Sequence, residues 1–184
     1  VRNDDEAAVL GLHLEGPYIN EKYKGAQYGP EIRPADLNEL EELWGLLGDR
    51  MRLVTLAPEV PGALEAIDWL VEKCVAVAIG HSDATYEEAT EGIKRGANHG
   101  THLYNGMRGL HHREPGVVGA LLAEPNAYVQ LIADLVHIHP GALKVALASK
   151  PLERIILITD AVQATGLEDG EYVLGDQRIF VKDG

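Results

Sequence analysis

Cysteine is almost absent from this sequence, and long apolar runs are missing altogether. The only cysteine of the 184 residues is Cys74, so no disulfide can form within the chain, which is typical of a reducing compartment. Its neighbours at residues 75–78 are all small and apolar, so we predict that Cys74 is a buried residue. There is no signal peptide and no apolar run of about 18 residues. We therefore expect a cytoplasmic protein without a membrane partner.

Positive charge is also scarce. The chain has 16 Lys and Arg residues against 29 Asp and Glu residues, which gives a formal net charge of -13. Nucleic acids and anionic membrane surfaces bind basic patches, so this balance argues against both as partners. An anionic small substrate would need a local basic pocket. The hydrophobic content of 46% is sufficient for the core of one domain.

Strand and helix patterns alternate along the chain. Apolar runs predict strands at residues 9–15, 52–57, 74–81, 97–103, 128–133 and 154–159. Helical periodicity predicts helices at residues 34–47, 63–73, 85–95, 117–123 and 140–149. Gly48 and Gly96 stand at stopping positions, and Thr85 with Glu88 forms a capping box. Such alternation favours an α/β fold with a parallel sheet.

Two α/β architectures compete for this pattern. A doubly wound sheet usually carries a Gly-rich phosphate loop, and neither GxGxxG nor a P-loop occurs here. A (β/α)8 TIM barrel collects catalytic groups from the ends of many strands, and we favour it. Such a barrel takes about 250 residues, so residues 1–165 predict an incomplete barrel of about six βα units. Residues 166–184 predict a β-hairpin that leads into a small β-sandwich domain.

Four separated residues share one local setting. Glu15, His81, His102 and Asp160 each stand at or near the end of a predicted strand, where parallel strands bring their side chains to one rim. One carboxylate and two imidazoles form a ligand set for a divalent metal, and a further Asp could move the protons of a bound water. A lone His is more often a turn or core residue. A carboxylate that closes an apolar strand is costly unless it is paired, so the four together favour a metal hydrolase.

Two further segments carry chemistry and have ordinary alternatives. His137, three residues after Asp134, could polarise a carbonyl group or merely cap the next helix. The loop at residues 110–116 contains His111, His112 and Arg113, which would suit a phosphate group, although a solvated turn has the same composition.

Seven short motifs occur in order between about Gly11 and Gly166. They are His13-Leu14-Glu15-Gly16-Pro17-Tyr18, Lys24-Gly25-Ala26, Gly80-His81-Ser82-Asp83-Ala84-Thr85, Thr101-His102-Leu103-Tyr104-Asn105-Gly106-Met107, Arg113-Glu114-Pro115-Gly116, Ile132-Ala133-Asp134 with His137, and Thr159-Asp160-Ala161. Together they resemble the N-acetylglucosamine-6-phosphate deacetylases of the amidohydrolase superfamily. No single motif is decisive, but seven in the same order are highly specific.

The resemblance implies a role for each matching residue. Glu15, His81 and His102 correspond to metal ligands, Asp160 to the general base and acid, and His137 to the imidazole that orients or polarises the acetamide carbonyl. The substrate-binding positions would be Asn105, the backbone at Gly106, Gln27 and the phosphate-binding Arg113. In this family that arginine commonly comes from the neighbouring subunit, so the resemblance also implies a homodimer.

The implied reaction removes the acetyl group from N-acetylglucosamine 6-phosphate and gives glucosamine 6-phosphate and acetate. His and carboxylate ligands favour Zn²⁺ as the divalent metal, with Fe²⁺, Mn²⁺ and Co²⁺ as alternatives. Another amidohydrolase, dihydroorotase-like or deaminase-like, is the rival enzyme. Dihydroorotase-like sites generally use a carboxylated Lys at a strand end, and no predicted strand ends in Lys. A non-catalytic fragment that binds only metal or sugar phosphate is the rival outside enzymes.

Three features depart from the family pattern. Gln27 replaces the usual His, and it can hydrogen-bond a sugar hydroxyl but cannot carry charge. Leu135 replaces the usual Gly, so we expect a different backbone shape in the loop that holds His137. The resemblance also implies that further barrel strands lie before Val1 and after Gly184, so the chain is expected to be a central fragment.

Overall fold

The computed structural model describes residues 7–175 and 177–182 and contains a large parallel sheet and a small antiparallel one. The large sheet has six strands in the order β1-β2-β3-β4-β5-β6, so strands that are consecutive in the chain are neighbours in space. Its strands are β1 (Leu12–Glu15), β2 (Met51–Leu56), β3 (Ala76–Ile79), β4 (His99–Gly100), β5 (Tyr128–Leu131) and β6 (Ile155–Leu157).

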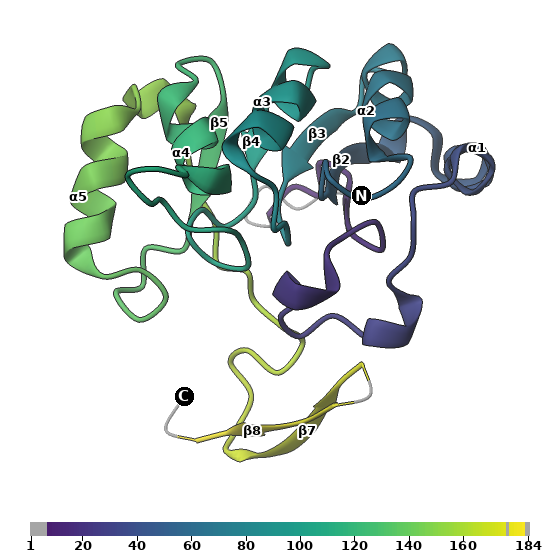
Figure 1. Ribbon diagram of the computed structural model, residues 1–184. Helices are drawn as coiled ribbons and strands as arrows, with labels where there is room; N and C mark the ends of the chain where they lie inside the picture. The colour runs from purple at the N-terminus through teal and green to yellow at the C-terminus, as the bar shows by residue number, and fades with distance from the viewer. Residues whose placement is uncertain (1–6, 176, 183–184) are drawn as a thin grey trace.

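One α-helix follows each of the first five strands. The helices are α1 (Leu37–Leu47), α2 (Ala63–Glu72), α3 (Tyr86–Lys94), α4 (Gly116–Ala123) and α5 (Pro140–Ser149). Short 3-10 turns occur at Glu21–Tyr23, Gly29–Glu31, Gly48–Arg50 and Leu152–Arg154. Figure 1 shows the helices in an arc along one side of the sheet. The α/β prediction is confirmed: the sheet and its helices form an incomplete TIM barrel of the amidohydrolase type.

Every predicted strand exists, but most are shorter than predicted at the end that faces the rim. His81, His102 and Asp160 follow β3, β4 and β6, and all three have positive φ angles of 49°, 32° and 53°. A left-handed residue turns the chain out of the extended conformation and ends the ladder. The apolar pattern does not show where these turns begin, which is why hydrophobicity alone overestimates the strands.

The prediction that Cys74 is buried is wrong. Cys74 is exposed, has a φ of 58° and occupies the first position after the cap of α2. The N–H of Cys74 donates to the carbonyl of Val71, and the N–H of Val75 donates to Leu70. These are the two hydrogen bonds of a Schellman motif, which needs a left-handed residue at this position. The end of α2 therefore takes the cysteine out of β3.

The other helix boundaries follow the sequence closely. The capping box of Thr85 and Glu88 is present, and Gly96 ends α3 with a φ of 116°, as predicted. Helix α1 begins at Leu37 and not at Pro34, because Asp36 is its N-cap and Ala35 donates its N–H to the carbonyl of Pro61. Gly48 is the C-cap of α1, also as predicted.

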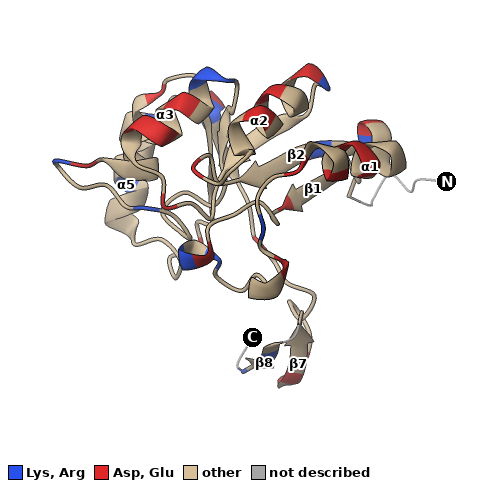
Figure 2. Ribbon diagram, turned by 45° about the vertical axis from the view of Figure 1, so that its right-hand side comes forward, with Lys and Arg blue, Asp and Glu red and all other residues tan. Residues whose placement is uncertain are grey.

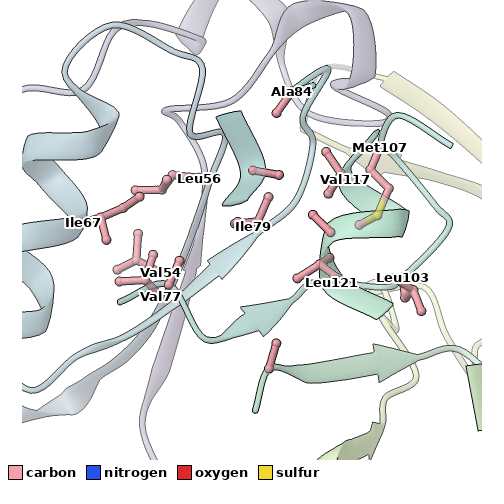
Figure 3. Packing of buried hydrophobic residues seen from close by; sticks show 14 of the residues in the cluster. Val54, Leu56, Ile67, Val77, Ile79, Ala84, Leu103, Met107, Val117 and Leu121 are labelled. Carbon is pink, nitrogen blue, oxygen red and sulfur yellow. The ribbon is translucent and has the colours of Figure 1, made fainter. Parts of the chain in front are cut away.

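The hydrophobic core lies between the sheet and the helices. Along β2, Val54 and Leu56 pack in this core, whereas Leu53 lies on the opposite, concave face. Figure 3 shows Ile67 of α2 near Val54 and Val77, and Leu121 of α4 further along the sheet. Fully burying one such side chain contributes about 1.5–3 kcal/mol. The concave face carries polar side chains such as His13, Thr101 and Asp160 beside Leu53.

Acidic residues gather on the outer helices. Figure 2 shows Asp and Glu positions, coloured red, along α1, α2 and α3. Within the described ranges, no helix is both long and apolar enough to span a membrane.

The tail forms a separate hairpin, which confirms the predicted pattern. Strands β7 (Gly170–Leu174) and β8 (Gln177–Val181) pair in antiparallel fashion and lie apart from the large sheet in Figure 1. Asp176, within the predicted hairpin, lies outside the described residues. The side-chain amide of Gln177 donates to the carbonyl of Ala26 at 3.3 Å, and Gln163 donates to the carbonyl of Val173. The hairpin therefore contacts the loop that follows β1.

Candidate metal centre and substrate cleft

Three side chains from three strand ends converge on one point. Glu15 closes β1, His81 follows β3 and His102 follows β4. Glu15 Oε1 lies 2.6 Å from His81 Nε2 and 3.3 Å from His102 Nε2, and the two imidazole nitrogens are 3.1 Å apart. Their ligand atoms all lie within 4.8 Å of one another. The structure thus brings together three of the four residues that the strand-end pattern selected.

Backbone carbonyls fix the orientation of both imidazoles. His81 Nδ1 donates to the carbonyl of Tyr23 at 2.7 Å, and His102 Nδ1 donates to the carbonyl of Asn105 at 3.0 Å. A carbonyl can only accept, so each Nδ1 carries the proton and each Nε2 turns a lone pair toward Glu15. Three lone-pair donors this close repel one another unless a cation lies between them, so the donor set fits a divalent metal.

Glu15 and His102 shift each other's pKa values. Burial disfavours the ionised form of Glu15, but without a metal the Nε2 atoms of His102 and His81 can take up protons and donate to Glu15, and these hydrogen bonds hold the pKa of Glu15 below its usual range. Burial likewise disfavours protonated His102, yet the hydrogen bond and negative charge of Glu15 raise the pKa of His102 overall. The ionised carboxylate of Glu15 therefore attracts positive charge, either as a proton on His102 or as a bound cation.

Gly106 lets its loop lie directly over the two imidazoles. Its φ is 56°, and a Cβ at this position would lie 3.2 Å from His81 Nδ1 and 3.3 Å from His102 Cε1. Both features favour glycine. The backbone here also shapes the site, because the carbonyl of Gly106 accepts the N–H of Ser82, the residue after His81.

Asp160 and Glu15 face the same open clefts. A cavity of about 890 Å³ on the concave side of the sheet is lined by His13, Glu15, Thr101 and Asp160, among others. A second cavity of about 510 Å³ is lined by Glu15, His81 and Asp160 and by Gln27. These volumes are in the range of small-ligand sites. Gln27 and Asp160 therefore line the same cleft as Glu15 and His81.

A chain of hydrogen bonds on the concave face was not predicted. His13 Nε2 lies 2.7 Å from Thr55 Oγ1, which lies 2.6 Å from Thr101 Oγ1. Gly80 makes room for the buried threonines, since a Cβ there would lie 2.8 Å from Thr101 Cβ and 2.9 Å from Thr55 Cγ2. His13 and Glu15 are two residues apart in β1 and so share a face, but nothing in the sequence indicates the partners of His13.

Three other predicted site residues have different surroundings. His137 is exposed; its Nδ1 lies 2.6 Å from Asp134 Oδ2, and it lines a separate cleft with residues of the hairpin. Arg113 is exposed in the loop of residues 110–116. The Asn105 side chain turns back toward the carbonyls of His102 and Leu103. Leu135, which stands where the family usually has glycine, has a left-handed φ of 66°.

The amidohydrolase family model matches residues 1–178 of the chain, which is nearly its whole length. The chain belongs to the amidohydrolase family. The converging Glu15, His81 and His102 lie at the carboxyl ends of barrel strands, where TIM-barrel enzymes keep their active sites.

Individual relatives have more specific names than the family model. The N-acetylglucosamine-6-phosphate deacetylase of Lysinibacillus sphaericus is 46% identical over 179 residues, which cover 97% of this chain and 46% of the relative. The N-acetylgalactosamine-6-phosphate deacetylase of Escherichia coli O157:H7 is 44% identical over 183 residues, which cover 100% of this chain and 48% of that protein.

The fold of this amidohydrolase chain is also found among solved structures. A mutant N-acetyl-D-glucosamine-6-phosphate deacetylase from Mycobacterium smegmatis, solved in complex with N-acetyl-D-glucosamine 6-phosphate, matches with a TM-score of 0.92 at 40% identity. The match covers 95% of this chain and 46% of that chain. The amidohydrolase chain spans about half the length of the relatives it matches.

Proposed function

We propose that the chain carries the metal centre of an N-acetylglucosamine-6-phosphate deacetylase, which hydrolyses the acetamide bond to give glucosamine 6-phosphate and acetate. The observation that carries the proposal is the convergence of Glu15, His81 and His102, with Asp160 on the same clefts. Relatives of that name at 46% identity support it over a dihydroorotase-like or deaminase-like alternative.

Glu15 and the Nε2 atoms of His81 and His102 would hold the metal, with Zn²⁺ favoured by the mixed imidazole and carboxylate donors. A bound divalent ion supplies Lewis-acid polarisation and lowers the pKa of a coordinated water. Because Nδ1 of each ring carries the proton and donates it to a carbonyl, the Nε2 lone pair of each ring is available to bind the metal.

Asp160 is the proton carrier in this proposal. Its carboxylate faces both cavities beside Glu15, where it can accept a proton as water attacks the acetyl carbonyl carbon. It then returns that proton to the amine nitrogen as the carbon–nitrogen bond breaks. Asp160 is exposed to the cleft, so its carboxylate is accessible to a water molecule and to the substrate.

The sugar phosphate would extend from the metal centre across the cleft. Gln27 lines the cavity of about 510 Å³ with Asp160 and can hydrogen-bond a sugar hydroxyl. We further propose that the Gly106 backbone and Asn105 contact the substrate and that His137 orients the acetamide carbonyl. In a homodimer, Arg113 would bind the phosphate group of the substrate held by the neighbouring subunit. Since Arg113 is exposed, its guanidinium is available to such a partner.

Acetate release from N-acetylglucosamine 6-phosphate by the full-length protein tests the reaction. We expect Glu15→Ala to remove the bound metal together with turnover, and Asp160→Asn to keep the metal while kcat falls by about 10²–10⁴-fold. Asp68→Asn is the control, because Asp68 pairs with Arg95 on the outer helices. Normal turnover in Asp160→Asn would show that another group moves the proton, and a pure wild-type protein without metal would refute the metal centre.

The configuration at C4 of the sugar is a second question, because one relative is an N-acetylgalactosamine-6-phosphate deacetylase. We propose the gluco substrate for this chain. The kcat/KM values for N-acetylglucosamine 6-phosphate and N-acetylgalactosamine 6-phosphate, measured side by side, decide the assignment, and a higher value for the galacto sugar would reverse it.

A further inference from the structure

Glu59 lies just beyond β2, and its carboxylate connects the loop after β1 with the loop after β3, which carries His81. Glu59 Oε1 accepts hydrogen bonds from Asn20 Nδ2 at 3.1 Å and from the Asp83 backbone N–H at 2.7 Å. Its Oε2 accepts the hydroxyl of Ser82 at 2.8 Å. Asn20 belongs to the loop after β1, and Ser82 and Asp83 to the loop after β3. One half-buried carboxylate therefore joins segments that are about sixty residues apart in the chain.

Both loops reach His81 directly. The N–H of Asn20 donates to the carbonyl of His81 at 2.8 Å, and the carbonyl of Tyr23, in the same loop, accepts the Nδ1 proton of His81 at 2.7 Å. Ser82 follows His81 in the chain. The position of the His81 main chain and the orientation of its ring thus both depend on how the two loops that Glu59 connects are placed relative to each other.

Neighbouring contacts extend this connection to His102. The N–H of Ser82 donates to the carbonyl of Gly106 at 3.2 Å, and Arg108 donates its N–H to the carbonyl of Ser82 at 2.9 Å. Asp83 pairs with Arg108 at 2.9 Å and with Lys22 at 2.9 Å. Lys22 and Arg108 belong to the loops after β1 and β4, so three loops meet at Ser82 and Asp83. Glu59, in the segment after β2, accepts hydrogen bonds from both of those residues.

We propose that Glu59 is a positioning residue of the metal centre: by holding Asn20, Ser82 and Asp83 together, its carboxylate sets the geometry of His81 and thereby the affinity for the metal ion. This inference rests on the proposed metal centre at Glu15, His81 and His102. Outer hydrogen-bond partners of metal-binding histidines commonly change metal affinity by 10–100-fold when they are removed.

The isosteric amide separates hydrogen bonding from charge. In Glu59→Gln the remaining oxygen can still accept from Asn20 and Asp83, and the new NH2 group can donate to the Ser82 hydroxyl, which can rotate to accept. In Glu59→Ala all three contacts are lost. A positioning role therefore predicts that Gln preserves metal affinity and that Ala does not.

The experiment measures Zn²⁺ affinity by competition with a chromophoric chelator, on the full-length wild type, Glu59→Gln, Glu59→Ala and Glu88→Ala. Glu88 is the matched control, since its carboxylate accepts the N–H and hydroxyl of Thr85 in the capping box of α3 but does not contact the loop after β1. Thermal unfolding of each metal-free variant establishes that it is folded. We expect Zn²⁺ affinity to fall about tenfold or more in Glu59→Ala and to change less than threefold in Glu59→Gln and Glu88→Ala.

Each outcome has a defined meaning. Unchanged affinity in folded Glu59→Ala would overturn the positioning role, and equal losses in Glu59→Gln and Glu59→Ala would overturn it in favour of a charge effect. An equal loss in Glu88→Ala would also overturn it, because general destabilisation would then explain the result. If the wild type itself binds no Zn²⁺ and releases no acetate, the proposed function fails, which is a different result from any of these.

Discussion

Gly106 lies so close to the two imidazoles that a side chain at this position would crowd them. Because its φ is 56° and a Cβ would lie 3.2 Å from His81 Nδ1, we expect Gly106→Ala to lower the free energy of unfolding by about 1–2 kcal/mol. The displaced loop would also disturb the carbonyl that orients His102, and Zn²⁺ affinity would fall about tenfold. Denaturant unfolding and chelator competition measure the two effects.

Gly45 is the control for this substitution. It lies within α1 and is exposed, and a Cβ there meets nothing within 4 Å. Gly45→Ala is expected to raise the free energy of unfolding by about 1 kcal/mol through helix propensity, with unchanged Zn²⁺ affinity. If Gly106→Ala behaved in the same way, the close approach of its loop to the imidazoles would have no energetic consequence.

Single residues differ in how far the sequence predicts them. Glu15, His81 and His102 were found because each interrupts an apolar pattern at a strand end, and this signal is local. Glu59 lies just after a strand too, but its role depends on Asn20 and Ser82, whose contacts only the folded chain defines. The position of His137, paired with exposed Asp134, depends on a loop conformation that sequence spacing does not fix.

The ends of helices α2 and α3 use the same hydrogen-bond motif with different residues. Gly96 occupies the left-handed position after α3, whereas Cys74 occupies it after α2 with a φ of 58°. A non-glycine residue in this conformation costs about 1–2 kcal/mol, and glycine loses about 0.5–1 kcal/mol more entropy on folding. We therefore expect Cys74→Gly to raise the free energy of unfolding by up to about 1 kcal/mol, as measured by denaturant unfolding.

The reverse change at α3 is the comparison. In Gly96→Ala a new Cβ would lie 2.8 Å from Val71 Cγ2 in addition to the conformational cost, so we expect a loss of about 1–2 kcal/mol. A destabilised Cys74→Gly protein would mean that the thiol of Cys74 makes a favourable contact that outweighs the backbone effect.

Helices were predicted better than strands. Helix α5 has the predicted bounds, and the capping box fixes the start of α3, because caps are local chemistry. Strand β4 was predicted over residues 97–103 but spans only His99–Gly100. Strand length depends on pairing with β3 and β5, which the apolar pattern of one segment does not contain.

The stability of the whole molecule should depend on metal and pH together. A divalent ion that binds only the folded state adds about 2.7 kcal/mol at a concentration of 100 times its Kd. Binding needs neutral imidazoles, and Glu15 raises the pKa of His102 despite its burial, so this gain should disappear as the pH falls through that raised pKa.

Without metal the pH trend has the opposite sign. The raised pKa of His102 stabilises the folded state fully below the unfolded-state value of about 6.5, and this contribution is lost as the pH rises through the folded-state value. The unfolding temperature should be measured between pH 5 and 8, once with excess Zn²⁺ and once with chelator. The difference between the two unfolding temperatures should grow as the pH rises. Parallel curves would contradict this coupling, and Glu15→Ala should give parallel curves as the control.

The molecular architecture was the most predictable level. Alternating strands and helices, together with the absence of a Gly-rich phosphate loop, favoured the barrel over a doubly wound sheet, and the order β1 to β6 confirms it. The hairpin at β7 and β8 was also recognised from its alternating pattern. The contact between Gln177 and Ala26 was not, because it joins segments that are far apart in the chain and follows from how the hairpin lies against the loop after β1.

The left-handed backbone at His81, His102 and Asp160 limits how the metal preference could be redesigned. Asn, Asp and His enter this conformation far more readily than other side chains with a Cβ, and β-branched residues are strongly disfavoured. A variant meant to favour a harder cation such as Mn²⁺ would exchange an imidazole for a carboxylate. At position 81 or 102 aspartate can supply that carboxylate within the existing backbone, whereas glutamate would add conformational cost to the change of ligand.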